Sequence, residues 1–159
     1  LTPIAKGFMT ETGLEAANLG VQIFGGHGFI REWGMEQNIR DARISTLYEG
    51  TTGIQSLDLL GRKVLGSGGK LLANFCGEVL VLLEEIGNDE SLADMSKALG
   101  ELLGEWEQLT RTIGERAVVD ANEVGGISVD YLMYSGYAVL AYFWAKISPF
   151  AWRRLLWLY

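Results

Sequence analysis

The residues best suited to chemistry in this chain lie in one short segment, Tyr48-Glu49-Gly50. A carboxylate between an aromatic ring and a glycine can be desolvated, which raises its pKa toward that of a useful general base. Most glutamates in turns are instead solvated and have no chemical role. The local sequence favours this ordinary alternative, so Glu49 needs support from the rest of the chain.

A glycine-rich segment, Gly25-Gly26-His27-Gly28, is the second candidate. It follows a predicted helix rather than a strand, so it is not a dinucleotide-binding fingerprint of the strand–turn–helix type. Without Cβ atoms, the backbone amides of Gly25 and Gly26 could closely approach a ligand phosphate. The alternative is a helix C-cap, which glycine often supplies. Taken alone, the segment favours the cap.

A zinc site and an internal disulfide are excluded by the number of histidines and cysteines. His27 is the only histidine, so it cannot build a zinc site, and we expect no metal. Cys76 is the only cysteine, so the chain forms no internal disulfide, and we expect this thiol in the apolar core. A lone thiol is compatible with a reducing compartment, and we expect a cytoplasmic location.

The charge is unevenly distributed. The formal net charge is −7, and residues 66–127 carry 4 basic and 12 acidic side chains, a balance of 4 − 12 = −8. An acidic segment of this kind repels phosphate backbones, which argues against a nucleic-acid partner.

The elements that position these residues are predicted to be all α-helical, because the only prolines are Pro3 and Pro149 and no stretch alternates apolar and polar residues. The first part of the chain predicts a helix over about residues 3–24, a loop to Gly34, a helix over 36–45, and a helix from Thr51 or Thr52 to about 65.

The segment Gly66-Ser67-Gly68-Gly69 is the best candidate linker. It separates a first domain, residues 1–65, from a second, residues 70–159, predicted to be an antiparallel up-and-down bundle of three helices. We expect the first of these to end near Gly87. We expect the second to begin at Asn88 or Asp89 and end at Gly125-Gly126, and the third to be capped by Ser128.

An uncharged stretch, residues 131–145, is too short for a membrane span, which needs about 20 residues. We therefore expect a buried bundle helix and no membrane span. The aromatic residues Trp152, Trp157 and Tyr159 are expected to pack on the bundle or on a partner chain. The chain starts at Leu1 directly in helix-like sequence, and we expect it to be a fragment of a longer protein.

Taken together, the separate signals form an ordered string. Residues 21–28, VQIFGGHG, are followed by Glu36, by Arg40-Asp41-Ala42-Arg43, and by residues 48–55, YEGTTGIQ. This order and spacing resembles the C-terminal helical domain of the acyl-CoA dehydrogenases, which are flavoenzymes. Residues 66–159 resemble the additional C-terminal helical domain of a longer subgroup of that family.

The resemblance implies an activity. Glu49 matches the catalytic base that removes the α-proton of an acyl thioester while the β-hydride passes to N5 of FAD, leaving a trans-2-enoyl-CoA. Such a base needs burial to raise its pKa, and the thioester oxygen needs donors to stabilise the enolate-like charge.

The resemblance also implies binding residues. Gln22, Gly25 and Gly26 match residues that contact the ADP half of FAD, typically that of a neighbouring subunit. Thr51 matches a residue near the flavin, and Tyr48 and Gly50 match residues lining the acyl site. Gly53 stands where the family usually has Glu or Gln, so it is left out of the site.

The resemblance further implies an electron-transfer flavoprotein as partner and a homodimer or homotetramer. Because the middle β-domain that supplies much of the flavin contact is absent, we expect the isolated chain to be inactive. One alternative is a relative that no longer dehydrogenates and binds another macromolecule. The acidic segment and the intact Glu49 argue against it. A further alternative is that residues 66–159 are purely structural, serving packing or oligomerisation.

Overall fold

The computed structural model describes the backbone of residues 1–155 and the side chains of residues 1–149. Within that part of the chain the protein is helical, with no β-strand, as predicted. The expected packing of Trp152, Trp157 and Tyr159 lies outside the described side chains. The helices are α1 (Thr2–Phe24), α2 (Gly26–Phe29), α3 (Met35–Ser45), α4 (Thr52–Leu57), α5 (Lys70–Ile86), α6 (Ala93–Val119) and α7 (Asn122–Leu155).

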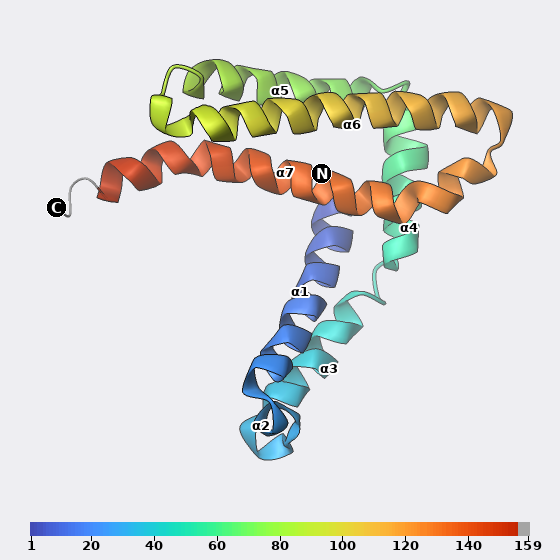
Figure 1. Ribbon diagram of the computed structural model, residues 1–159. Coiled ribbons are helices and arrows are strands. Elements are labelled where there is room, and N and C mark those ends of the chain that lie inside the picture. The colour runs from blue at the N-terminus through green and yellow to red at the C-terminus, as the bar shows by residue number, and fades with distance from the viewer. Residues whose placement is uncertain (156–159) are drawn as a thin grey trace.

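Two arrangements make up the fold (Figure 1). Helices α5, α6 and α7 lie alongside one another as a bundle, while α1 and α3 form an arm that projects from α7 and carries α2 at its tip. Helix α7 also packs against α1 and α4, so the bundle and the arm share an interface. The two are joined covalently through residues 66–69, where Gly68 and Gly69 take the positive φ angles of 62° and 80° that favour glycine.

The Glu49 turn is followed by a capped helix, as predicted. Thr51 is the N-cap of α4, and its hydroxyl oxygen accepts a hydrogen bond from the Ile54 amide at 3.5 Å. The predicted regular helix to residue 65 is irregular instead: α4 continues as a π-helix over Asp58–Val64 and a 3-10 turn over Leu65–Ser67. The loop predicted between residues 25 and 34 also contains helical turns, namely α2 and a 3-10 turn at Arg31–Trp33.

The predicted boundary between the two last helices is wrong. Helix α6 ends at Val119 and α7 begins at Asn122, so Gly125-Gly126 lie inside α7. The physical reason is a polar cap: the Asp120 carboxylate accepts hydrogen bonds from the Asn122 amide at 2.9 Å and its side-chain nitrogen at 3.0 Å. Ser128 therefore caps nothing; it is buried, and its hydroxyl lies 3.0 Å from that of Ser56.

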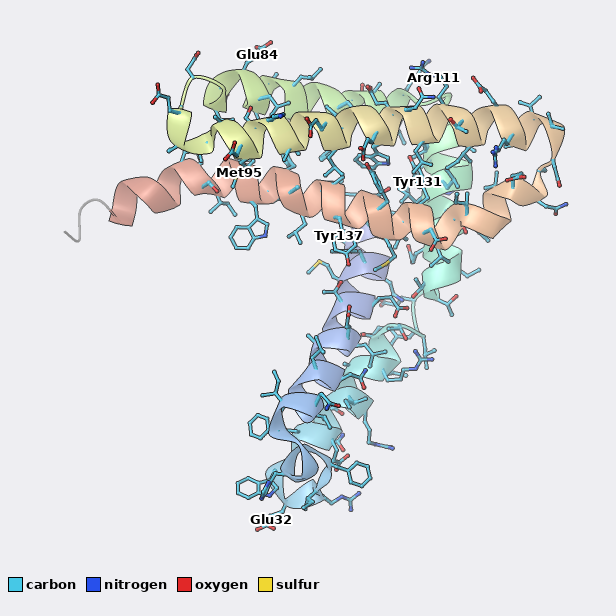
Figure 2. The ribbon with its side chains drawn as sticks, in the orientation of Figure 1. Glu32, Glu84, Met95, Arg111, Tyr131 and Tyr137 are labelled. Carbon is cyan, nitrogen blue, oxygen red and sulfur yellow. The ribbon has the colours of Figure 1, made fainter. Side chains whose placement is uncertain are left out.

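A polar pair links α6 and α7 in the core of the bundle. The fully buried Tyr131 donates its hydroxyl proton to Thr110 at 2.7 Å, because the Thr110 hydroxyl itself donates to the Trp106 carbonyl at 2.7 Å. Figure 2 shows Tyr131 between α7 and α6. Burial raises the pKa of Tyr131, so this hydroxyl keeps its proton at neutral pH.

Cys76 lies in this core on α5, as expected. Burial, together with the nearby Glu107 carboxylate, raises the pKa of the thiol to about 11. Because the thiolate is the nucleophile, we predict that the Cys76 peptide of the native full-length protein resists a thiol reagent at pH 8. It should be labelled after denaturation, as read by mass spectrometry. Full labelling of Cys76 under native conditions would contradict its placement in the core.

One bent pair of helices in the described part of the chain has the length and apolar composition of a membrane span. None of them is by itself long and apolar enough to cross a membrane, but Thr52–Ser67 and Lys70–Ile86 pass together by length and composition, with a bend of 91° between them.

Candidate functional site

Glu49 lies in the turn between α3 and α4, where the backbone is strained. Its φ is 56°, which makes it the single non-glycine residue with a positive φ in the described part of the chain. Gly50 follows with a φ of 89°. A left-handed conformation costs a residue with a Cβ roughly 1–2 kcal/mol. The surroundings of this turn must therefore stabilise it.

Four side chains make hydrogen bonds in and around this turn. Gln55 donates from Nε2 to the Glu49 carbonyl at 2.9 Å, and Lys6 donates from Nζ to the Gly50 carbonyl at 2.6 Å. Next to them, the Thr52 hydroxyl donates to the Glu11 carboxylate at 2.5 Å. Lys6 and Glu11 belong to α1, so the turn is bound to the arm as well as to its own helix.

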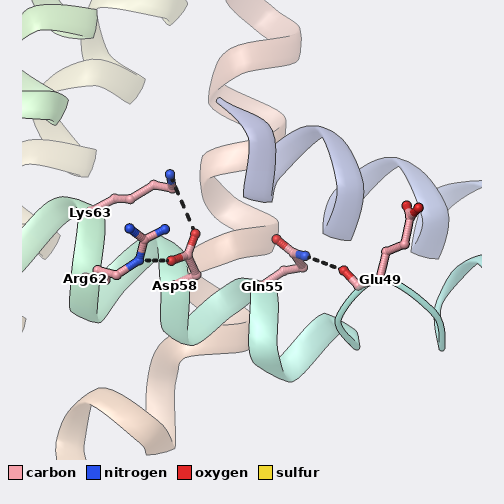
Figure 3. A network of polar contacts seen from close by, with 5 residues as sticks. All are labelled: Glu49, Gln55, Asp58, Arg62 and Lys63. Atoms are coloured by element: carbon pink, nitrogen blue, oxygen red, sulfur yellow. Dashed lines mark hydrogen bonds and ion pairs between the residues drawn. The ribbon is translucent and has the colours of Figure 1, made fainter.

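The Glu49 side chain is exposed, and Figure 3 shows it extending away from the helix that carries Gln55. Its neighbour Tyr48 is also exposed, to 49%. The carboxylate is thus presented on the surface of this chain, held by a constrained backbone. The residues described here leave it accessible to a ligand or to another part of a larger protein.

The glycine-rich segment lies at the other end of the arm. Gly25 ends α1 with a φ of 57°, and neither Gly25 nor Gly26 has an atom within 4 Å of where a Cβ would stand. Helix α1 thus ends at a glycine C-cap with positive φ, as expected, and the backbone there is open to a close approach. Helix α3, with 11 residues and a length of roughly 16 Å, separates this turn from Glu49.

A groove, which the sequence did not predict, runs along α1 on the side facing α7. It has a volume of about 730 Å³. Residues of α1 from Glu11 to Gln22 line the groove, and Gln22 is the one nearest the tip of the arm. Thr52 and Glu11 lie beside the Glu49 turn. Val129 and Met133 of α7 close another side. The groove depends on how α7 crosses α1, which no local pattern in the sequence indicates.

A charged network continues along the helix after Gln55 (Figure 3). Asp58 is hydrogen-bonded and ion-paired to Arg62, and Lys63 Nζ lies 3.7 Å from its second oxygen. The hydrogen bond from Arg62 holds the pKa of Asp58 below its ordinary value. The network joins residues 58 to 63 across the π-helical segment and is distinct from the Glu49 turn. Among the described residues, no three His, Cys, Asp or Glu side chains group as metal ligands.

Two family models match this chain. Residues 1–65 match a model described as "Acyl-CoA dehydrogenase, C-terminal domain", and residues 72–155 match one described as "Acetyl-CoA dehydrogenase C-terminal like". The first match contains Glu49 and the whole arm, and the second contains α6, α7 and most of α5.

Several curated proteins are similar over most of the chain. The 3-methylmercaptopropionyl-CoA dehydrogenase of Ruegeria pomeroyi is 41% identical over 141 residues, which are 86% of this chain and 23% of that protein. The broad-specificity linear acyl-CoA dehydrogenase FadE5 of Mycobacterium tuberculosis is 32% identical over 148 residues, 89% of this chain and 24% of that protein. The chain therefore spans about a quarter of the length of these relatives.

Proposed function

The chain belongs to the acyl-CoA dehydrogenase family, and we propose that it is the C-terminal part of a flavin-dependent enzyme that oxidises an acyl-CoA to a trans-2-enoyl-CoA. The observation that supports this most is the Glu49 turn. It lies within the segment that matches the family's C-terminal domain and presents a carboxylate from a constrained backbone just before a helix.

In this proposal Glu49 is the general base that removes the α-proton of the thioester. FAD, when bound, supplies the acceptor for the β-hydride. The carboxylate is free of the hydrogen bonds that hold the turn, which use the backbone carbonyls of Glu49 and Gly50 instead. The Glu49 side chain is exposed in this chain. The desolvation that a base requires must therefore come from parts of the parent protein outside this chain.

The proposed FAD contacts fit the exposed turn at the end of α1. Gly25 and Gly26 leave their amides unshielded by a Cβ, and the neighbouring Gln22 is exposed. The length of α3 places this turn far from Glu49, so the two ends of the arm serve different parts of the cofactor or two cofactors. That arrangement supports a shared site, in which the arm contacts the ADP half of a neighbouring subunit's FAD.

Other residues of the turn complete the proposed site. The Thr51 hydroxyl oxygen accepts from the Ile54 amide, so its own proton is available to a flavin atom. Tyr48 and Gly50, which flank the base, line the acyl site. The domain division at residues 66–69, an electron-transfer flavoprotein as electron acceptor, and a homodimer or homotetramer remain part of the proposal.

The proposal is tested by flavin content and substrate reduction. The full-length protein should purify with a flavin absorbance spectrum that bleaches anaerobically on addition of an acyl-CoA. The 159-residue chain alone should be colourless and inactive, because it holds only part of the contacts. A full-length protein without flavin, or one whose spectrum no straight-chain or branched acyl-CoA bleaches, would contradict the proposed activity.

A further inference from the structure

We propose that Lys6 and Gln55 are positioning residues that clamp the Glu49 turn in its left-handed conformation and thereby aim the carboxylate. This inference rests on the proposed function of Glu49 as the base. Neither side chain is proposed to touch the substrate. They act through two successive backbone carbonyls, those of Glu49 and Gly50.

The need for a clamp follows from the backbone. Glu49 and Gly50 both have positive φ, at 56° and 89°. Glycine adopts this conformation freely, but glutamate does not. Without outside contacts the Glu49 backbone would relax toward a negative φ, and the direction of its Cα–Cβ bond would change. A side chain of this length would then move its carboxylate by more than the tolerance of a proton transfer, which requires hydrogen-bond reach.

Gln55 supplies the first contact from within α4. Its side chain reaches back six residues to donate to the Glu49 carbonyl at 2.9 Å. The approach is close: a Cβ at position 50 would lie 2.9 Å from Gln55 Nε2. A side chain at position 50 would therefore displace the Gln55 amide from its hydrogen bond, so glycine suits this contact as well as the positive φ.

Lys6 supplies the second contact from a separate element. Its ammonium, in the first turns of α1, donates to the Gly50 carbonyl at 2.6 Å across 44 residues of sequence. A hydrogen bond from a charged donor is roughly twice as strong as a neutral one. The Thr52–Glu11 bond, between the first residue of α4 and α1, holds the helix that follows the turn against the same element. The turn is thus fixed from two directions, along its own helix and across to the arm.

The test uses the full-length flavoprotein and the rate constant of flavin reduction in a single turnover at saturating acyl-CoA. Gln55→Met and Lys6→Met remove the donors at similar size, and Lys6→Arg keeps a donor. We expect both Met variants to lower this rate constant about 10- to 100-fold with KM changed less than about threefold, and Lys6→Arg to restore most of it. Gln108→Met and Lys97→Met, exposed positions on α6, are the matched controls and should equal wild type.

A loss of folded protein is separated from misplacement by the form of the data. Partial unfolding lowers the amplitude of flavin reduction, whereas a misplaced base lowers its rate constant. If Gln55→Met folds poorly, Gln55→Leu, which also lacks a donor and adds no charge, takes its place. Hydrogen exchange of the peptide containing residues 48–52 gives an independent readout and should be faster in the Met variants.

The Glu49→Gln variant, measured in parallel, distinguishes the two possible failures. If Glu49→Gln is inactive while both Met variants reduce flavin at the wild-type rate constant, the clamp is wrong and the proposed function stands. If Glu49→Gln itself reduces flavin at the wild-type rate, Glu49 is not the base, and both the proposed function of this turn and the positioning role of Lys6 and Gln55 are wrong.

Discussion

Replacing Glu49 with glutamine in the full-length protein should lower kcat by at least about 100-fold, the lower end of the range for loss of a general base. Glutamine keeps the length of the side chain, and the backbone contacts from Gln55 and Lys6 are made to carbonyls that the substitution leaves in place. The amide cannot accept the α-proton at neutral pH. The measured loss therefore reports the chemistry rather than the fold, and KM should change little.

Two comparisons make this result specific. Flavin content should equal that of wild type, because Glu49 is not among the residues proposed to bind FAD. Glu84→Gln, on the outer surface of α5 (Figure 2), is the matched control and should leave kcat unchanged. Wild-type turnover in Glu49→Gln would remove the central residue of the proposed mechanism.

The second large effect is on stability. Gly136 of α7 lies against Phe8 of α1, and a Cβ at this position would stand 2.2 Å from two atoms of the Phe8 ring. The ring is buried, and it packs edge-on against Tyr137 with ring centroids 5.0 Å apart, so it has little room to move. Gly136→Ala should therefore separate α1 from α7. Overpacking of this kind typically costs about 1–3 kcal/mol, seen as a lower Tm.

Gly126→Ala on the same helix is the matched control. No atom lies within 4 Å of its Cβ position, and the glycine is exposed. Alanine is favoured over glycine in a helix by roughly 0.8–1.0 kcal/mol, so this variant should hold or raise Tm. Equal Tm changes in the two variants, measured by calorimetry, would show that the α1–α7 contact is not close-packed.

The helical class and most helix limits could be predicted from the sequence alone, because they depend on neighbouring residues. The two prolines near the ends, the 3-to-4-residue spacing of apolar side chains, and Thr51 as a cap are all local signals. Glu49 was singled out by its neighbours and by the order of motifs along the chain, and its role as a base stays a prediction. The boundary between α6 and α7 was predicted wrongly because two glycines were favoured over Asp120 as the end signal, although the Asp120 side chain supplies the cap.

Only the tertiary structure shows which residues hold the Glu49 turn in its conformation. The sequence shows that a glutamate precedes a glycine; it does not show that Lys6, 44 residues away from Gly50, donates to the turn. The same is true of the contact between Phe8 and Gly136, which fixes the arm on the bundle, and of the groove between α1 and α7. Hydrogen bonds and close packing depend on distances of a few ångströms between segments far apart in the chain. Those distances are set by how the helices pack against one another, so they cannot be predicted from a local sequence pattern.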